Sequence, residues 1–186
     1  MKARGRFFGV AFLIVVTLTG TSLYAQVLPA KVKYETPMLA LVFVTPDCPI
    51  SQKYMARLNE MHASFSAEIT WLAVVPGNVS KQEIKAFSEE YQSPLNFLPD
   101  KDFVLVKALN ARVTPEIFLF DQSRALVYHG AIDNWFYELG KNRREVTEHY
   151  FLDAVKAVQT ESTPKVKATE AVGCFIQTPA DHHRHH

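Results

Sequence analysis

The chain has 186 residues, of which 48% are hydrophobic, and its 20 basic and 19 acidic side chains leave a formal net charge of +1. This length and composition suit one globular domain with short additional segments. The nearly balanced charge gives no reason to expect nucleic acid as a partner.

The first residues have the pattern of a secretory signal peptide. Lys2, Arg4 and Arg6 precede an apolar stretch over 7–17, and small residues follow over 20–25. A positive start, a short apolar run and a small-residue cleavage region are the three parts of such a signal. We expect cleavage after Ala25, with a cut after Ser22 or an uncleaved membrane anchor as alternatives. In either case the domain lies outside the cytoplasm, in the periplasm or the extracellular space, where a disulfide can persist.

A buried strand followed at once by a helix is predicted around Cys48. The apolar run over 39–45 is too short for an ordinary helix and is stopped by Pro46 and Asp47. Pro49 suits the first position of a helix over 49–64. Cys48 would then lie at the helix N-terminus, where free N–H groups and the helix dipole favour the reactive thiolate. The negative charge of Asp47 would oppose this effect unless Asp47 caps the helix.

Strands and helices alternate through the next part of the chain. A β-rich run over 69–75 should lie beside the first strand, and Ser80 with Glu83 forms a capping box that starts a second helix. A short helix is expected over 103–110. This order is typical of a parallel sheet with crossover helices.

The last third of the domain is predicted to contain a hairpin and a terminal helix. Residues 117–120 and 126–129 should pair as antiparallel strands around a turn at 121–123. Residues 135–144 are expected to form a loop over one end of the sheet, and a helix should follow over 146–160. A short edge strand is expected over 32–34.

The chain resembles the thioredoxin-like superfamily, and within it the redoxin (AhpC/TSA-like) group. The resemblance rests on Asp-Cys-Pro-Ile at 47–50, on Thr114-Pro115 before a strand, on Ala-Ile-Asp-Asn at 131–134, and on Thr-x-x-x-Gly-Cys-x-Ile at 169–176. It implies an α/β fold with a central mixed sheet, flanking helices and a C-terminal antiparallel hairpin plus helix. It also implies that Pro115 is in the cis form and faces the active cysteine.

The first functional hypothesis is a secreted thiol–disulfide oxidoreductase. Ser51 stands where related proteins carry the second cysteine of Cys-x-x-Cys, so a resolving thiol must come from elsewhere in the chain or from a partner. In this hypothesis Cys48 is the attacking thiol and Cys174 the resolving thiol. Thr114, Pro115 and Pro49 would contact the substrate. The expected partners are protein or small-molecule disulfides, or peroxide, together with an unidentified thiol reductant.

Two other functions stay open at this point. In peroxiredoxin-like thiol peroxidases a Thr precedes the peroxidatic cysteine by three residues, as Thr45 does here, and a Pro stands four residues before that Thr. This chain has Leu41 at the Pro position and only Arg124 as a possible counterpart of the distant Arg. Alternatively, Cys48 and Cys174 form a permanent structural disulfide in a non-catalytic binding module.

We divide the chain into a signal peptide over 1–25, a thioredoxin-like domain over 26–160 and a C-terminal tail over 161–186. The tail carries Cys174 and ends in a histidine-rich segment. That segment offers weak metal candidates, His182, His183, His185 and His186, although a solvated tail is the simpler interpretation. No cofactor is expected, and membrane contact is expected only if the signal segment is uncleaved.

Overall fold

The structure, a computed structural model, describes residue 32 and residues 34–179. The helices are α1 (Pro49–Phe65), α2 (Lys81–Glu90), α3 (Val104–Leu109) and α4 (Tyr150–Gln159). The strands are β1 (Met38–Phe43), β2 (Ile69–Pro76), β3 (Asn96–Asp100), β4 (Val113–Thr114), β5 (Glu116–Asp121), β6 (Leu126–Gly130), β7 (Phe136–Glu138), β8 (Lys141–Asn142) and β9 (Cys174–Phe175). The predicted signal peptide and the histidine-rich end lie outside the described residues.

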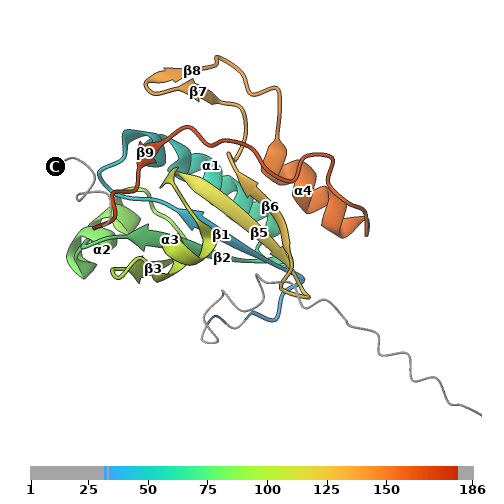
Figure 1. The fold of residues 1–186 in the computed structure, drawn as a ribbon, viewed down its shortest axis with the longest axis horizontal. Helices are drawn as coiled ribbons and strands as arrows, with labels where there is room; N and C mark the ends of the chain where they lie inside the picture. The colour runs from blue at the N-terminus through green and yellow to red at the C-terminus, as the bar shows by residue number, and fades with distance from the viewer. Residues whose placement is uncertain (1–31, 33, 180–186) are drawn as a thin grey trace, which may run out of the picture.

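Five strands form the central sheet in the order β3-β2-β1-β5-β6 (Figure 1). β1 and β2 are parallel, as are β2 and β3, whereas β5 pairs antiparallel with both β1 and β6. The predicted mixed sheet and C-terminal hairpin are therefore confirmed. β1 lies in the middle of the sheet, which explains why its sequence is a continuous apolar run rather than an alternating one.

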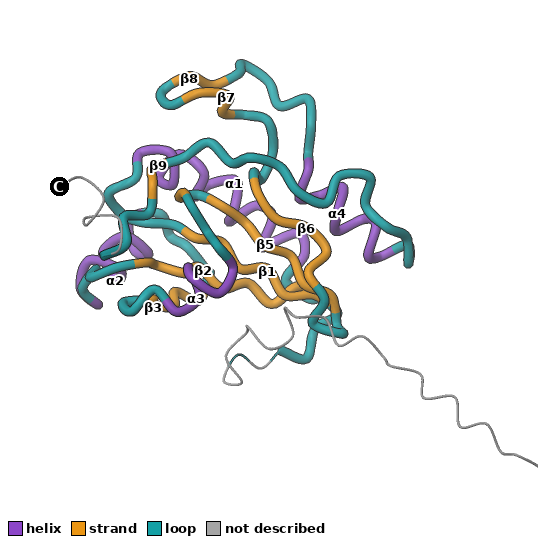
Figure 2. The backbone as a smooth tube through the Cα atoms, in the orientation of Figure 1, coloured by secondary structure: helices purple, strands orange, loops and turns teal. Residues whose placement is uncertain are grey.

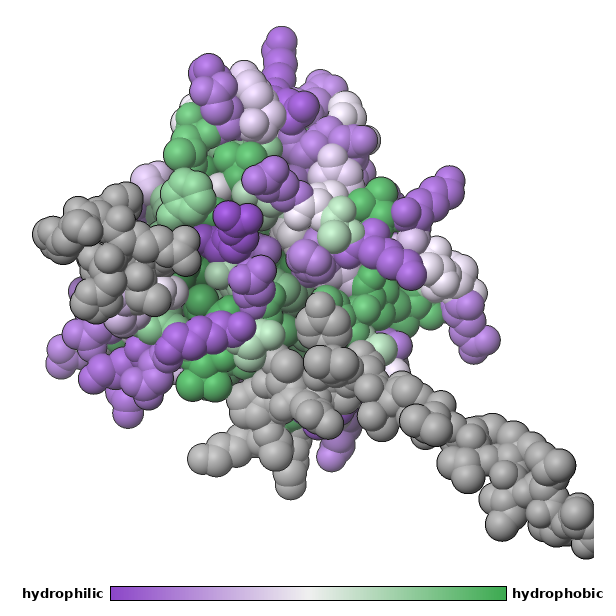
Figure 3. Space-filling model, viewed as in Figure 1, coloured by the Kyte–Doolittle hydropathy of each residue, from purple (hydrophilic) through white to green (hydrophobic). Residues whose placement is uncertain are grey.

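Helices cover both faces of this sheet. Ala40 and Val42 of β1 belong to a core shared with α1 and α4, including Met55, Leu58 and Phe151. The alternate β1 residues, Leu39, Leu41 and Phe43, belong to a second core with α3. This alternation is the two-residue period of a strand. On the face viewed in Figure 3, green apolar surface remains visible between purple polar side chains.

Four local predictions need correction. Residues 96–100 form a strand, β3, that was not predicted. The expected loop over 135–144 contains the small β7–β8 hairpin, which projects from the sheet in Figure 2. Neither Val32 nor Tyr34, the described residues of the expected edge strand, lies in a strand. The last helix begins at Tyr150 rather than at residue 146.

The late start of α4 has a tertiary cause. The side chain of Asn134 accepts hydrogen bonds from the backbone N–H groups of Thr147 and Glu148, at 3.0 and 3.2 Å. These bonds hold residues 147–148 outside the helix that the sequence predicted from residue 146. A buried polar side chain thus overrides local helix propensity.

A buried carboxylate fixes the β7–β8 hairpin to α1. Asp133 accepts hydrogen bonds from Tyr54 Oη at 2.6 Å, from Arg57 Nη1 at 3.0 Å and from the Trp135 N–H at 2.9 Å. Its side chain is fully buried, so these three donors replace the water that the charge would otherwise bind. The Arg57 guanidinium also lies 4.8 Å from the Trp135 ring centroid.

Among the described residues, no helix is both long and apolar enough to cross a membrane.

We predict that Asp133→Asn lowers the free energy of unfolding by about 2–4 kcal/mol, because Arg57 loses the anion that compensates its partial burial. Urea denaturation of the purified protein measures this change. Glu138→Gln removes a carboxylate from the exposed pair with Lys141, at 2.8 Å, and should change stability by less than about 0.5 kcal/mol. Equal effects of the two substitutions would contradict the assigned role of Asp133.

Candidate active site

Cys48 is the N-cap of α1. Its side chain accepts a hydrogen bond from the Ser51 N–H at 3.4 Å, and Pro49 occupies the start of the helix. The sequence placed Cys48 at this junction because Pro46 and Asp47 end the apolar strand pattern and Pro49 starts a helical one. Cys48 itself makes the capping bond, so the exposed Asp47 does not cap α1. Cys48 is only 1% exposed.

The proline loop before β5 faces this cysteine, and the Thr114–Pro115 peptide bond is cis, as expected. The Cys48 thiol donates a hydrogen bond to the Thr114 carbonyl oxygen at 2.9 Å. Thr114 is buried and Thr45 lies close to it, with 3.5 Å between the two hydroxyl oxygens. The proline loop therefore contacts both Thr45, which follows β1, and the sulfur of Cys48, which begins α1.

The C-terminal segment brings Cys174 to the same place. β9 pairs antiparallel with β4, and in this register Cys174 lies opposite Thr114. Figure 1 shows the segment after α4 running past the ends of β5 and β6 to reach β9 beside α1. Both cysteines are free thiols, with Cys48 buried and Cys174 half-buried. The structure thus brings together Cys48, Cys174, Thr114 and Pro115.

Gly173 permits this close approach. A Cβ atom at Gly173 would lie 2.3 Å from the Thr114 carbonyl oxygen and 2.7 Å from its carbonyl carbon. Side chains do not tolerate such distances to backbone atoms, so only glycine fits beside the proline loop. The glycine of the Gly-Cys sequence therefore has a steric role, which is to let its neighbour Cys174 reach Cys48.

The two thiols have different acidities. Burial opposes ionisation of Cys48, but hydrogen bonds from Cys174, from the hydroxyl and N–H of Ser51 and from the Thr114 side-chain hydroxyl outweigh it and lower the pKa of Cys48. Burial, reinforced by the hydrogen bond to Cys48 and by its charge, raises the pKa of Cys174 to about 12. The arrangement favours a thiolate at Cys48 beside a protonated Cys174.

Two residues of the site were not predicted. The Ser51 side chain is fully buried and stabilises the Cys48 thiolate, although its sequence position suggested only a missing cysteine. Glu116 accepts hydrogen bonds from the backbone N–H groups of Arg112 and Val113, at 2.8 and 3.4 Å, and so shapes the approach to the proline loop. Burial raises the pKa of Glu116 despite these bonds. A charged residue at the start of an apolar strand is the signal that could have identified it.

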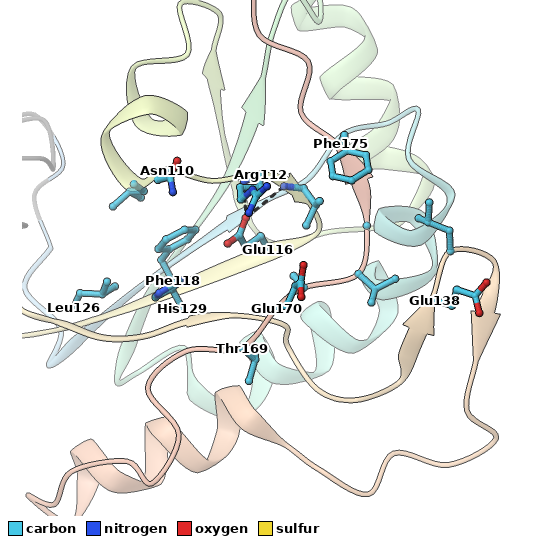
Figure 4. A pocket seen from close by; sticks show the side chains of 16 residues that line it. Asn110, Arg112, Glu116, Phe118, Leu126, His129, Glu138, Thr169, Glu170 and Phe175 are labelled. Atoms are coloured by element: carbon cyan, nitrogen blue, oxygen red, sulfur yellow. Dashed lines mark hydrogen bonds between the residues drawn. The ribbon is translucent and has the colours of Figure 1, made fainter. Parts of the chain in front are cut away.

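Glu116 also lines a cavity of about 750 Å³ beside the C-terminal segment (Figure 4). Its wall includes Phe118, His129 and Gly173, but neither cysteine. This cavity is therefore separate from the pair of sulfur atoms.

Of the residues considered for a peroxidase, only Thr45 lies near Cys48. Thr45 lies in the loop near Cys48, but Arg124 lies in the β5–β6 turn, where it contacts Val32 O at 3.3 Å. That turn adjoins Asp121, which pairs with Met38 at the start of β1, whereas Cys48 follows the other end of β1. Arg124 is therefore not the counterpart of the peroxidase arginine. Leu41 is buried in the middle of β1.

The remaining candidates are placed as follows. Pro49 is exposed at the start of α1. The histidines at 182, 183, 185 and 186 lie outside the described residues. Within residues 34–179, no group of three or more His, Cys, Asp or Glu side chains is arranged to hold a metal ion.

We predict that the reduced protein shows two thiolate absorbance steps at 240 nm, one below and one above the ordinary cysteine pKa. The lower step belongs mainly to Cys48 and should move to higher pH in Ser51→Ala, because the thiolate loses a hydrogen-bond donor. Ser64→Ala, on the same helix, is the control and should leave both steps in place. An unchanged lower step in Ser51→Ala would contradict the assignment.

Gly173→Ala should displace β9 from β4, because the new methyl group would overlap the Thr114 carbonyl. We expect oxidation by glutathione disulfide to form the Cys48–Cys174 disulfide at least tenfold more slowly than in the wild type. Mass spectrometry after alkylation measures it. Gly140→Ala is the control for a glycine substitution, since a Cβ at Gly140 meets no atom within 4 Å, although its φ of +74° adds local strain. Wild-type oxidation by Gly173→Ala would refute the steric role.

Comparisons with known proteins agree with this fold. A hypothetical protein from Sinorhizobium meliloti 1021 has a TM-score of 0.70 at 24% identity, over 78% of this chain and 81% of that one. An uncharacterized conserved protein from Geobacillus kaustophilus has a TM-score of 0.70 at 22% identity, over 77% and 78%. A putative thioredoxin from Neisseria meningitidis has a TM-score of 0.50 at 16% identity, over 66% and 73%.

No curated protein matches the chain. The AhpC/TSA family, in contrast, matches residues 31–129, which is just over half of the sequence. The matched range contains β1, Cys48, α1 and the proline loop, and the structural neighbours share the overall thioredoxin-like fold. The chain therefore belongs to the AhpC/TSA family and has a thioredoxin-like α/β fold.

Proposed function

We propose that the protein is an exported thiol–disulfide oxidoreductase in which Cys48 attacks and Cys174 resolves. The observation that carries the proposal is the placement of a buried, acidified thiol at a helix N-terminus with a second, weakly acidic thiol hydrogen-bonded to it. Packing alone requires neither feature. Membership of a redoxin family supports oxidoreductase activity in general.

The reaction follows from the two acidities. The Cys48 thiolate attacks one sulfur of a substrate disulfide, forms a mixed disulfide and releases the other substrate sulfur as a thiolate, which takes a proton. Cys174 then gives up its proton and attacks Cys48 Sγ. This step forms the Cys48–Cys174 disulfide and releases the second substrate thiol. One substrate disulfide has been reduced to two thiols, and the cysteine pair has been oxidised.

An external thiol reductant then reduces the Cys48–Cys174 disulfide and restores the two free thiols, Cys48 and Cys174. Because every step is an exchange, the same site can also run in the oxidising direction, and the potential of the pair relative to its partners decides which. Disulfides and a thiol reductant are therefore the proposed partners. No nucleic acid or cofactor enters the reaction.

Thr114, Pro115 and Pro49 are proposed to contact the substrate. Pro49 is exposed beside Cys48, whereas the pairing edge of Thr114 is taken by β9 in the reduced protein. A peptide substrate that pairs with this edge would have to replace β9.

Export is proposed from the signal-like pattern of residues 1–25, which places the domain in the periplasm or the extracellular space. The proposed mature protein comprises the thioredoxin-like domain over 26–160 and the tail over 161–186. An oxidising compartment would keep an intramolecular disulfide available for exchange.

The test is a redox titration of the mature protein against glutathione, in which free thiols are counted by mass after alkylation. We expect one intramolecular Cys48–Cys174 disulfide with a potential near that of thioredoxin, roughly −270 mV, or more oxidising. Cys174→Ser, the matched control, should instead accumulate a glutathione adduct on Cys48.

Two results would overturn the proposal. A disulfide that resists reduction below about −300 mV would identify a structural bond in a non-catalytic module. No intramolecular disulfide, together with rapid sulfenic acid formation at Cys48 under peroxide, would identify a thiol peroxidase.

A further inference from the structure

Cys48 is shielded from solvent in part by the segment that carries its partner thiol. We call residues 169–176 the strap. Cys48 is 1% exposed, and β9, the strand within the strap, lies against the proline loop that contacts the Cys48 sulfur. A substrate disulfide must approach the attacking sulfur closely in line, so the strap has to leave β4 before Cys48 can attack.

The N-terminal end of the strap is firmly bonded. Thr169 Oγ1 accepts a hydrogen bond from the Ala131 N–H at 2.9 Å and lies 2.6 Å from Tyr128 Oη, which itself donates to the Ala131 carbonyl at 2.6 Å. Because the Tyr128 proton is used on Ala131, Thr169 donates to Tyr128, and the three residues form a closed ring of hydrogen bonds. The Thr169 N–H also donates to the His129 carbonyl at 3.1 Å.

The middle of the strap is loosely held. Among the hydrogen bonds of the described residues, none involves the backbone of residues 170–172. These residues, with Thr169, line two cavities of about 750 and 600 Å³. Val172 packs against the core that contains α1, whereas Glu170 and Ala171 have cavity space beside them in which the chain can change direction.

The C-terminal end of the strap depends on a few contacts. β9 pairs Cys174 and Phe175 with β4, and the Cys174 sulfur also has hydrogen bonds with Cys48 and with the Ile50 N–H. Ile176 adds a hydrogen bond from its N–H to the Arg112 carbonyl at 2.9 Å and packs its side chain against the core that contains α3. Phe175 is 72% exposed and contributes little to this packing. Cys174 packs against the core that contains α1, and Ile176 is the side chain that packs the C-terminal end of the strap against the core that contains α3.

We propose that Ile176 is a positioning residue that holds Cys174 against Cys48, and that the strap opens from its Ile176 end while Thr169 stays attached. This inference rests on the proposed function, because the opening would expose Cys48 to a substrate sulfur and the closing would return Cys174 to Cys48. Thr169 keeps Cys174 within five residues of a fixed point, a reach of at most about 17 Å. The resolving thiol therefore remains close while the site is open.

The test measures how often the strap opens in the reduced protein. Iodoacetamide is added to the native protein, and labelling of Cys48 is followed by peptide mass. When closing is faster than labelling, the rate is proportional to the open fraction. We expect Ile176→Ala to raise the Cys48 labelling rate about tenfold, because the strap loses the half-buried apolar contacts of Ile176 with the core that contains α3. Ile176→Val should raise it only about two- to threefold.

Phe175→Ala is the matched control, since it removes a larger apolar side chain from the neighbouring, exposed position. We expect it to leave the rate within about twofold of the wild type. Low urea concentrations, below the unfolding transition, should hardly change the labelling rate of any variant, because local opening exposes little surface. The urea series also distinguishes local opening from global unfolding in a variant of reduced stability. If Cys48 were exposed by global unfolding, its labelling rate would rise steeply with urea concentration.

Equal rates for Ile176→Ala and the wild type, an equal increase in Phe175→Ala, or a steep urea dependence would each overturn the inference. Labelling is carried out on the reduced protein and needs no disulfide exchange. Its outcome is therefore independent of the glutathione titration, and a failure of the proposed function can be told apart from a failure of the positioning role of Ile176.

Discussion

The contact between the Cys48 sulfur and the Thr114 carbonyl, at 2.9 Å, is the constraint on which the rest of the site depends. This contact requires the end of β1, the start of α1 and the proline loop to lie close together at Cys48. The central position of β1 makes this possible, because the apolar side chains on its two faces fix the strand between α1 and α3. The Cys48 sulfur then accepts hydrogen bonds from Ser51 in the first turn of α1 and from Cys174 in the C-terminal segment.

Close backbone approach is the second requirement of the site. Gly130, at φ +127°, has no room for a Cβ beside the Thr169 carbonyl, just as Gly173 has none beside Thr114. The C-terminal segment is therefore laid directly onto the backbone of the domain at two points, without side chains between them. Of the Thr-x-x-x-Gly-Cys-x-Ile residues, Thr169 bonds the segment to β6 and its following turn, Gly173 allows contact, Cys174 supplies the thiol and Ile176 packs against the core.

Much of this arrangement could be predicted where the signal is local. The apolar run of β1, Pro49 at the helix start, the Ser80–Glu83 capping box and the hairpin around 121–123 are all patterns of neighbouring residues, and the structure contains each of them. The cis peptide bond at Pro115 followed from the family resemblance rather than from the residues themselves. Predictions failed where distant contacts decide the outcome, as at the start of α4, which is set by Asn134.

The site shows the same division. Cys48 was identified from its own neighbours, whereas the donor role of Ser51 and the shaping role of Glu116 depend on how the chain returns to the same place. Arg124 was wrongly considered because a sequence does not indicate at which end of the sheet a turn lies. The pairing of Cys174 with Cys48 across a long sequence separation was predicted, whereas the strand register that places Cys174 opposite Thr114 could be obtained only from the fold.

The most direct test of the central claim, that Cys48 attacks and Cys174 resolves, is the order in which the two sulfur atoms react. Reduced protein is mixed with glutathione disulfide, quenched with acid at intervals and mapped by mass. We expect a glutathione adduct that appears first on Cys48 and decays as the Cys48–Cys174 disulfide forms. An adduct that appears first on Cys174, or an intramolecular disulfide that forms equally fast in a protein whose Cys48 is already blocked, would contradict it.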